Sequence, residues 1–383
     1  MALRVARISA AAHLGFVRGR RSVSFLQTPG WGRVKTEWRS ESLGWFDGGK
    51  LVGAGLVLHR PVPRFERFTL AYVPQGPTID WAGDIAAWLD PLAVCLKADG
   101  AFAIRLCPPV RTDTWNAAVV KDGIAAPGVR RLAEAAGGRV DAVGSRVARW
   151  LGDAGWLPQS PEDGFGVGQP QFTYEIPLAG RTEDDLLKGM NQVWRRNIKK
   201  AEKEGVEVTA RRVGRGGADG GAFGAELKAF HELYVHTAER DHFMPRPLRY
   251  FATMFAEMGA EDPERIKLYL ARHQGDLVAA TILVRVGGHA WYTYGASSTA
   301  KREVRGSNAC QWAMIPDSLA AGCDVYDLRG ITSTLDADDP HVGLIRFKVG
   351  TGGQAVRYVG EWDLPLRPMV YRAFDLYMRR RSG

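Results

Sequence analysis

Two stretches that lie far apart in the chain repeat one pattern. Gly49–Arg60 reads GKLVGAGLVLHR, and Gly275–Val286 reads GDLVAATILVRV. In each, a glycine and a charged residue precede a Leu-Val pair and an apolar run, which is typical of a strand that leaves a tight turn. An aromatic stretch follows each one, FTLAYVPQGP in the first half and HAWYTYGAS in the second. A repeat of this kind restricts the fold to copies of one structural unit.

The repeated unit continues with a helix and a buried strand. Residues 84–99 (DIAAWLDPLAVCLKAD) and 307–321 (SNACQWAMIPDSLAA) each carry a tryptophan and are followed by a glycine, a residue that readily ends a helix. Ser307 is predicted to cap the second helix. The buried strands AFAIRL and DVYDLRG come next. The sequence therefore predicts an α/β fold with two related domains in tandem, against the alternative of a chance likeness between common α/β units.

The Gly- and Pro-rich stretch Pro158–Gln171 is the predicted boundary between the two domains. We expect a first domain over residues 1–165, a second over 166–363, and a C-terminal helix within 364–383. That last helix cannot extend the repeat of the second domain, so we expect it to pack back on the first domain. The glycine-rich residues 211–224 are predicted to form a flexible surface loop.

The charge of the chain favours an anionic partner. Its 383 residues carry a formal net charge of +9, and the pI is near 9.4. RNA, a phosphorylated small molecule and a lipid surface all fit this charge, and a merely basic protein is the remaining alternative.

The cysteines and the N-terminus indicate a cytoplasmic protein. The four cysteines include no CxxC pair and are expected to be free thiols in a reducing compartment. Arg4 and Arg7 interrupt the apolar residues of the N-terminus, which argues against a signal peptide. A short strand and a helix capped by Ser9 fit better. The longest apolar stretch is far shorter than the roughly 20 residues that span a bilayer.

Residues 183–204 are predicted to form one amphipathic helix with a basic face. The expected buried side chains fall at helical spacing: Leu186, Met190, Val193, Trp194, Ile198 and Ala201. The basic residues are Arg195, Arg196, Lys199, Lys200 and Lys203. This face fits a nucleic-acid or phosphate surface, and a solvated basic face is the equally weighted alternative.

The segment GLIRFKVGTGG, Gly343–Gly353, is predicted to be a strand followed by a turn. It is no Walker loop, because the lysine of that motif follows the glycines and precedes Ser or Thr. On a strand, Phe347 and Lys348 would point to opposite faces. A lysine is costly to bury without a purpose, so a functional Lys348 is favoured over an exposed edge lysine. Arg240, at the end of another predicted helix, fits either a pyrophosphate clamp or, preferably, a salt bridge to Asp241 or Glu239.

Taken together, these stretches resemble the Fem family of peptidoglycan interpeptide-bridge aminoacyltransferases, and are most similar to its FemX-type members from actinobacteria. The motifs that carry the resemblance run in order from about Ser24 to the C-terminus: SFLQTPGWGRVKTEW, YVPQGP, NQVWRRNIKKAEKEGVEV, HTAERDHF, YTYGAS, YDLRG and GLIRFKVGTGG…YVGEWD. The resemblance implies two acetyltransferase-like (GNAT) domains in tandem. It also implies transfer of an amino acid from an aminoacyl-tRNA to a side-chain amine of the peptidoglycan stem peptide.

The resemblance assigns roles to particular residues. Lys35 is similar to a lysine that binds the pyrophosphate of the muramyl precursor, and Arg240 is similar to its partner. Tyr294 resembles a tyrosine that lines the substrate cleft, with Tyr292 as a rival for that position. The pair Phe347 and Lys348 resembles residues that bind the tRNA end and stabilise the tetrahedral intermediate.

The resemblance also implies the partners. The donor would be an aminoacyl-tRNA, with glycyl-tRNA as the first choice. The acceptor would be lipid II or the UDP-MurNAc-pentapeptide. Neither a cofactor nor a metal is expected, because the ester of the donor is already activated and no metal-ligand spacing occurs among the histidines and cysteines. The protein is expected to be a cytoplasmic monomer, with peripheral contact at the inner leaflet of the membrane left open.

The chain departs from the pattern of the Fem family at two places. Cys107 stands where many relatives carry an aspartate. The loop near Gly216 is too short for the coiled-coil arm of some relatives, so an armless member is expected. A coenzyme A-dependent acetyltransferase is the rival enzyme, but its pyrophosphate loop is poorly matched by EVRGSNA, with Glu303 and Asn308 at unsuitable positions. A non-catalytic RNA-binding protein is the alternative from another class.

Overall fold

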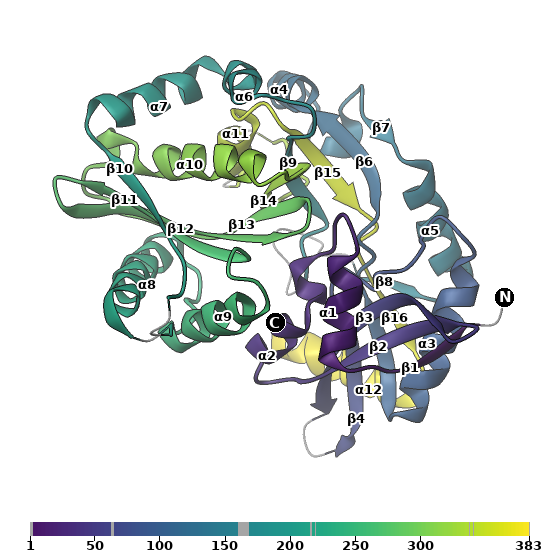
Figure 1. Ribbon diagram of the computed structural model, residues 1–383. Coiled ribbons are helices and arrows are strands. Elements are labelled where there is room, and N and C mark those ends of the chain that lie inside the picture. Colours follow the sequence, from purple (N-terminus) through teal and green to yellow (C-terminus); the bar gives the residue numbers. More distant parts are fainter. Residues whose placement is uncertain are drawn as a thin grey trace. The chain divides into compact units, whose positions relative to one another are not determined.

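The computed structural model describes residues 3–62, 65–159, 168–214, 217–218, 220–336, 338–339 and 341–382 (Figure 1). Two compact units make up the chain. The first unit comprises Met1–Thr114, Arg139–Phe172 and Val356–Gly383, and the second comprises Trp115–Gly138 and Thr173–Ala355. Within the described residues, no helix combines the length and the apolar character needed to cross a membrane.

The units differ from the expected ranges 1–165 and 166–363. Residues 115–138 belong to the second unit, because Ala117 N donates to Gly353 O and Leu132 N donates to Ser333 O. The chain returns to the first unit at Val356. These boundaries depend on hydrogen bonds between segments far apart in the chain, which local composition does not reveal. The expected boundary at residue 165 and the centre of the expected loop at Gly216 lie outside the described residues.

The first unit holds a seven-stranded sheet. Its order is β1 (Arg4–Arg7), β2 (Arg39–Asp47), β3 (Lys50–Val62), β4 (Phe65–Val73), β5 (Ala101–Leu106), β16 (Glu361–Pro365) and β8 (Leu157–Gln159). The pair β4–β5 is parallel, and the neighbouring pairs β3–β4 and β5–β16 are antiparallel. The short strands β6 (Arg111–Asn116) and β7 (Arg139–Val140) form a further antiparallel pair.

Helices pack on this sheet around a tryptophan-rich core. They are α1 (Ala10–Arg18), α2 (Pro29–Val34), α3 (Ile85–Ala98), α5 (Ala142–Asp153) and α12 (Pro368–Ser382). The predicted N-terminal strand and helix are confirmed, since Ser9 caps α1 by accepting from Ala12 N. Trp45 lies in the centre of the main core, and Leu89 of α3 and Leu151 of α5 pack in the same cluster.

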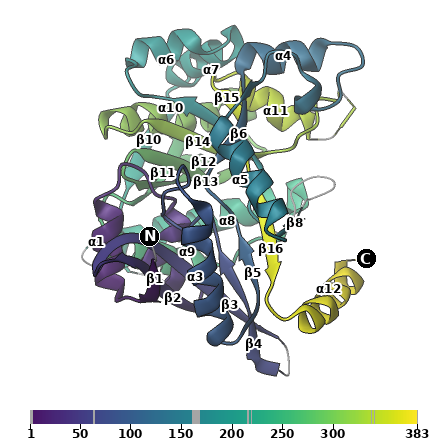
Figure 2. The same cartoon turned by 90° about the vertical axis from the view of Figure 1, so that its right-hand side faces the viewer.

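The C-terminal helix α12 packs within the first unit, as expected (Figure 2). Tyr371 is buried with Leu70 and Phe102 in a small core of its own, and the ring of Phe374 lies 5.1 Å from that of Phe102. An aromatic cluster against β4 and β5 therefore holds this helix.

The second unit repeats the plan of the first. Its strands follow the order β10 (Glu207–Arg211), β11 (Ile266–His273), β12 (Asp276–Val286), β13 (His289–Ser297), β14 (Val325–Ile331) and β9 (Phe172–Pro177). The antiparallel strands β11–β12–β13 are followed by α10 (Gly306–Ala320) and the parallel strand β14, as β2–β3–β4 are followed by α3 and β5. The helices α7 (Gln192–Lys203) and α10 lie on one face, while α8 (Gly221–Asp241) and α9 (Leu248–Glu261) lie on the other (Figure 1).

The segment Gly343–Gly353 is not the predicted strand. Residues Val342–Val349 form the helix α11, and the next strand, β15 (Gln354–Tyr358), begins only after the glycines. The buried residues Val342, Ile345 and Val349 recur at helical spacing, which the apparent alternation of the sequence hides. In a helix, neighbouring side chains lie about 100° apart around the axis, so Phe347 and Lys348 do not point in opposite directions.

The glycines after α11 serve close packing. A Cβ at Gly350 would collide with the ring of Trp194, and a Cβ at Gly353 would collide with the backbone of Glu175. Gly352 combines a positive φ of 76° with close approach to the backbone of Gly189. The turn therefore binds α11 to its neighbours rather than closing a hairpin.

Three further expectations for the second unit were wrong. Residues 183–204 form two helices, α6 (Glu183–Gly189) and α7, because Asn191 adopts extended backbone and caps α7 by accepting from Trp194 N. Val193 is 60% exposed instead of buried. Ser307 does not cap α10, which is preceded by Arg305 in a left-handed conformation. The second unit also contains the helix α4 (Ala117–Ala125), which contacts α11.

Candidate active site

The parallel strands β13 and β14 separate part way along their length. Their register pairs His289 with Val325 and Trp291 with Asp327, whereas β13 continues to Ser297 and β14 to Ile331. In the first unit, the corresponding strands β4 and β5 stay paired to Val73 and Leu106. The second unit thus has a separation of these two strands at the end of β14 that its counterpart lacks.

Lys348 contacts the end of β14, beyond the point where the strands separate. Its side chain is buried, and the residue is only 4% exposed. The Nζ atom donates to Gly330 O at 2.6 Å and to Arg329 O at 3.3 Å. Arg329 has a positive φ of 65°, and its N–H donates to Asp327 Oδ1 at 2.5 Å. This local turn directs consecutive carbonyl groups toward the lysine.

The surroundings of Lys348 adjust its charge. Burial lowers the pKa of its ammonium to about 7, and the Arg329 guanidinium adds to that lowering. The carboxylate of Asp327 acts in the opposite direction, because it favours the charged lysine. Lys348 therefore gains and loses its proton near neutral pH, where an exposed lysine stays charged.

Asp327 is a buried carboxylate in the last residue pair that joins β13 and β14. Burial alone would raise its pKa, but the nearby imidazole of His289 and the charge of Arg329 hold that pKa below its ordinary value. The His289 Nε2 atom lies 3.6 Å from Asp327 Oδ2, and the His289 ring stacks on Trp291 at 4.0 Å. The motif YDLRG did not predict a role for Asp327, although an acid inside an apolar strand is a signal of a functional residue.

Phe347 of α11 contacts α7, the helix that carries the basic residues. Its half-buried ring lies 4.8 Å from that of Trp194, and the indole N–H of Trp194 donates to Phe347 O at 2.8 Å. The sequence reasoning counted Trp194 only as a core residue. The structure shows that it joins α7, with its cations, to the helix that carries Lys348.

A bulge separates the two candidate tyrosines. Ile282 pairs with Tyr294 and Leu283 pairs with Tyr292, so Thr293 is the extra residue of β13. Because the strand gains one residue there, Tyr292 and Tyr294 lie on opposite faces of the sheet.

The surroundings of the two tyrosines agree with this. The Tyr294 hydroxyl lies 3.0 Å from that of Tyr250 on α9, and its ring lies 5.1 Å from Phe251. Burial raises the pKa of Tyr292 to about 12, and the Cys310 thiol of α10 contributes to that rise.

Arg240 is engaged within the second unit. Its Nε and Nη2 donate to the Asp241 carboxylate at 2.8 and 3.0 Å, and its Nη1 donates to Ser297 O at 2.9 Å. The salt bridge to Asp241 raises the pKa of Arg240. The preferred sequence interpretation, a salt bridge, describes this arrangement, and an anion would have to compete with Asp241.

Lys35 lies in the first unit, directly after α2. Its Nζ atom is 3.3 Å from Glu37 Oε1 and 5.6 Å from the centre of the Trp31 ring. Lys35 belongs to the first unit and Arg240 to the second.

The cations of α7 divide into two groups. Arg195 is half-buried and donates to Lys188 O and Met190 O, where it stabilises the end of α6. Arg196 and Lys199 are exposed, and Lys200 is partly exposed. Lys203, the last residue of α7, is exposed as well, and these four are the cations of the predicted basic face that remain directed to solvent.

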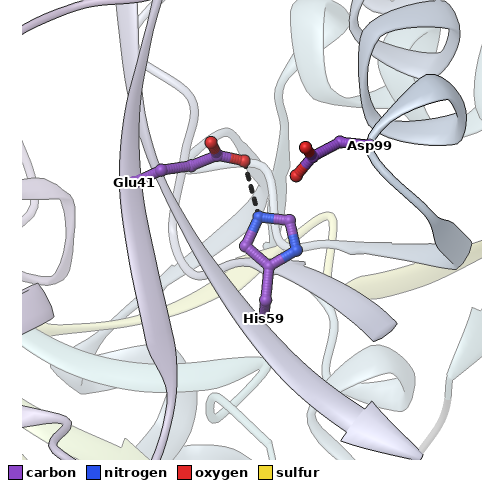
Figure 3. A group of neighbouring side chains, drawn as sticks. All are labelled: Glu41, His59 and Asp99. Atoms are coloured by element: carbon purple, nitrogen blue, oxygen red, sulfur yellow. Dashed lines mark hydrogen bonds and ion pairs between the residues drawn. The ribbon is translucent and has the colours of Figure 1, made fainter. Parts of the chain in front are cut away.

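Within the described residues, one group of side chains has the composition of a metal site. Glu41, His59 and Asp99 gather in the first unit, and His59 Nε2 lies 2.6 Å from Glu41 Oε1 (Figure 3). Arg7 pairs with both carboxylates, and Arg39 Nη2 lies 2.9 Å from Asp99. Two guanidinium groups already neutralise these acids, so the cluster is an ion-pair network that joins β2, β3 and the end of α3.

Comparison with solved structures defines the fold. The crystal structure of FemX matches with a TM-score of 0.77 at 20% identity, covering 97% of this chain and 99% of that chain. A tandem GNAT protein from the clavulanic acid biosynthesis pathway matches with a TM-score of 0.52 at 12% identity, covering 95% and 98%. The predicted fold of two GNAT-like domains in tandem is therefore confirmed, and the protein is an enzyme of the acyltransferase class.

Sequence comparison then defines the family. The lipid II:glycine glycyltransferase of Staphylococcus haemolyticus is 23% identical over 95% of this chain and 93% of its own length. The enzyme of the same name from Staphylococcus aureus strain MRSA252 is 22% identical over the same shares. The FemAB family matches residues 8–274 and 264–379, and the chain belongs to this family.

Proposed function

We propose that the enzyme transfers glycine from glycyl-tRNA to the side-chain amine of the stem peptide of lipid II, as the first residue of an interpeptide bridge. The observation that carries the proposal is the buried Lys348, whose ammonium is held by backbone carbonyls at the end of β14, where β13 and β14 have separated. The family and the names of the curated relatives support glycine as donor residue and lipid II as acceptor. The UDP-MurNAc-pentapeptide is the alternative acceptor.

The reaction needs little beyond positioning and charge stabilisation. The acceptor amine attacks the carbonyl carbon of the aminoacyl ester, a C–N bond forms, and the carbonyl oxygen becomes an oxyanion. When the intermediate collapses, the C–O bond to the ribose breaks, and the ribose oxygen takes up a proton that the amine releases. The acceptor amine must first be neutral, although its ordinary pKa is about 10.4.

Lys348 fits the role of oxyanion donor. An ammonium group has three N–H donors, and hydrogen bonds to Gly330 O and Arg329 O occupy two of them. The two carbonyls fix the ammonium, and the third donor is left for a substrate oxygen. A fixed donor of this kind contributes about 3 kcal/mol to the stability of the transition state.

The donor tRNA would bind along α7 and α11. The exposed cations Arg196 and Lys199, with Lys200, suit the phosphates of the acceptor stem. Phe347 offers an aromatic ring for the terminal base, since stacking on aromatic side chains is the usual way to hold an unpaired base. The contact between Phe347 and Trp194 supports this reading, because it links the phosphate-binding helix to the helix of Lys348.

The acceptor substrate would be bound by Lys35, Arg240 and Tyr294. Lys35 and Arg240 would each bind phosphate oxygens of the muramyl pyrophosphate. Tyr294, on the α9 face of β13, would contact the acceptor through its hydroxyl.

The test is a transfer assay with purified components. Lipid II and UDP-MurNAc-pentapeptide would be incubated separately with a panel of charged tRNAs, and the products would be measured by mass. The proposal expects the mass of one glycine to be added to lipid II from glycyl-tRNA. It fails if no aminoacyl-tRNA serves as donor, and acetylation from acetyl-CoA would favour the rival acetyltransferase. Binding of tRNA without any transfer would favour the RNA-binding alternative.

A further inference from the structure

The C-terminal helix α12 exposes an apolar stripe. Met369 is 86% exposed and Leu376 is 52% exposed, and Tyr377 is exposed beside Leu376. These residues are seven and eight positions apart and therefore lie on one face of the helix. Tyr371 and Phe374 occupy a different face, which packs on β4 and β5. The exposed stripe is thus a second apolar surface that folding of the first unit does not use.

A groove runs beside this stripe. It has a volume of about 460 Å³ and is lined by Val62, Phe68 and five residues of α12 between Met369 and Tyr377. All the lining side chains are apolar or aromatic. The groove and the exposed stripe form one continuous surface, because Met369 and Tyr377 belong to both.

Positive charge borders the groove. The guanidinium of Arg67 lies 4.7 Å from the centre of the Phe68 ring, and that of Arg367 lies 5.5 Å from the same ring. Arg372 is exposed on α12. From residue 367 to residue 382 the sequence contains five arginines and a single acid, Asp375. An apolar stripe edged by arginines is the pattern of a helix that lies in the surface of an anionic membrane.

We propose that α12 and its groove form a docking surface for a bilayer that contains anionic phospholipids. Met369, Leu376 and Tyr377 enter the boundary between head groups and acyl chains, while the bordering arginines contact lipid phosphates. The charge selects this occupant, since an uncharged apolar partner would gain nothing from the arginines. The inference goes beyond the proposed reaction and holds whichever group the enzyme transfers.

The experiment measures sedimentation of the full chain with vesicles. One set of vesicles contains phosphatidylcholine alone, and the other contains phosphatidylcholine with phosphatidylglycerol. We expect binding to the anionic vesicles that weakens as salt is raised. The double variant Met369→Ser/Leu376→Ser should bind them at least tenfold more weakly, and Arg67→Glu/Arg372→Glu should lose the preference for phosphatidylglycerol.

The control is a double variant at two other exposed valines of the first unit, Val94→Ser/Val140→Ser. It removes a similar apolar area away from α12 and should bind within twofold of the unchanged protein. Thermal unfolding of each variant would confirm that the fold is kept. The proposal is overturned if neither vesicle binds, or if the α12 variant binds as well as the control. It is also overturned if the α12 variants abolish a dimer seen by sedimentation velocity without affecting vesicle binding, since the surface would then join two copies of the chain.

Discussion

Lys348 donates a hydrogen bond of 2.6 Å to the carbonyl oxygen of Gly330, and this bond joins the last turn of α11 to the end of β14. The donor comes from a helix and the acceptor from a strand that has just lost its parallel neighbour β13. Backbone carbonyls that a partner strand would normally engage are thus available to orient an ammonium group. The position of the lysine follows from the separation of the two strands.

Replacing Lys348 by Met should abolish most turnover and leave the fold intact. Methionine retains the apolar stem and removes the charge, so the loss of an oxyanion donor should lower kcat on the order of a hundredfold. A single-turnover assay with glycyl-tRNA measures this step without product release. The exposed neighbour Arg346 provides the control, because Arg346→Met removes a cation from the same helix. A Lys348→Met protein within threefold of the unchanged enzyme would exclude the proposed role.

Replacing Asp327 by Asn should shift the pH profile of the enzyme. Asn keeps an oxygen to accept from Arg329 N but loses the charge that favours the ammonium of Lys348. The pKa of Lys348 should therefore fall further, and the decline of kcat at high pH should begin about one pH unit lower, a typical shift for loss of one nearby charge. A structural role alone would lower kcat equally at every pH, and such a result would contradict the electrostatic effect of Asp327 on Lys348.

Stability should rise with pH above neutrality. The pKa of Lys348 is about 7 in the folded protein and 10.5 ordinarily, so between these values the unfolded chain binds more protons than the folded one. The free energy of unfolding should therefore increase with pH in this window, by at most about 1.4 kcal/mol per pH unit from this group. Denaturant unfolding at several pH values measures the slope. The slope should be smaller in Lys348→Met, and an equal slope in both proteins would show that Lys348 does not titrate there.

Reversing two exposed charges on α7 should weaken tRNA binding. Arg196→Glu/Lys199→Glu removes two phosphate contacts, so fewer counterions are released and the dependence of affinity on salt should be less steep. Filter binding at several salt concentrations gives the slope. Lys121→Glu/Lys228→Glu changes the same net charge at exposed positions on α4 and α8 and serves as the control. If the two double variants behave alike, α7 carries only a solvated basic face.

Lys35→Ala and Arg240→Ala should each raise KM for the acceptor more than they lower kcat. A cation 4 Å from a phosphate contributes about 4 kcal/mol of Coulomb energy at an effective dielectric near 20, less the desolvation cost. Asp241→Asn is a further test. It removes the carboxylate that accepts hydrogen bonds from Arg240, and it should therefore lower the KM for the acceptor. Steady-state kinetics with each acceptor gives both constants. An unchanged KM in Lys35→Ala and Arg240→Ala would refute the pyrophosphate assignment.

Much of the fold could be predicted from the repeat. The glycine turns before β3 and β12 and the helix-then-strand order are local features, and the structure has them in both units. The prediction of a strand at Val342–Val349 was wrong, because the apolar residues of this short segment fit both the helical and the strand periodicity. Tertiary packing favours the helix, since the glycines from Gly350 to Gly353 let α11 approach Trp194 and β9.

The candidate site was predicted in part. Lys348 was singled out because a lysine on a central strand is costly to bury, and the residue is buried although it lies on a helix. Asp327 and the carbonyls of Arg329 and Gly330 received no role, because their relation to Lys348 exists only in three dimensions. The choice between Tyr292 and Tyr294 likewise depended on the bulge at Thr293, which one strand's sequence does not reveal.

The sequence by itself determined the duplicated α/β plan and the family, and it singled out Lys348 as a candidate, because turn glycines, apolar runs and ordered motifs are properties of the chain alone. Only the tertiary structure decided what surrounds that lysine. Strands β13 and β14 separate in the second unit, whereas β4 and β5 stay paired in the first. The charge of Lys348 then depends on its burial and on the opposed effects of Asp327 and Arg329, which only the folded chain brings together.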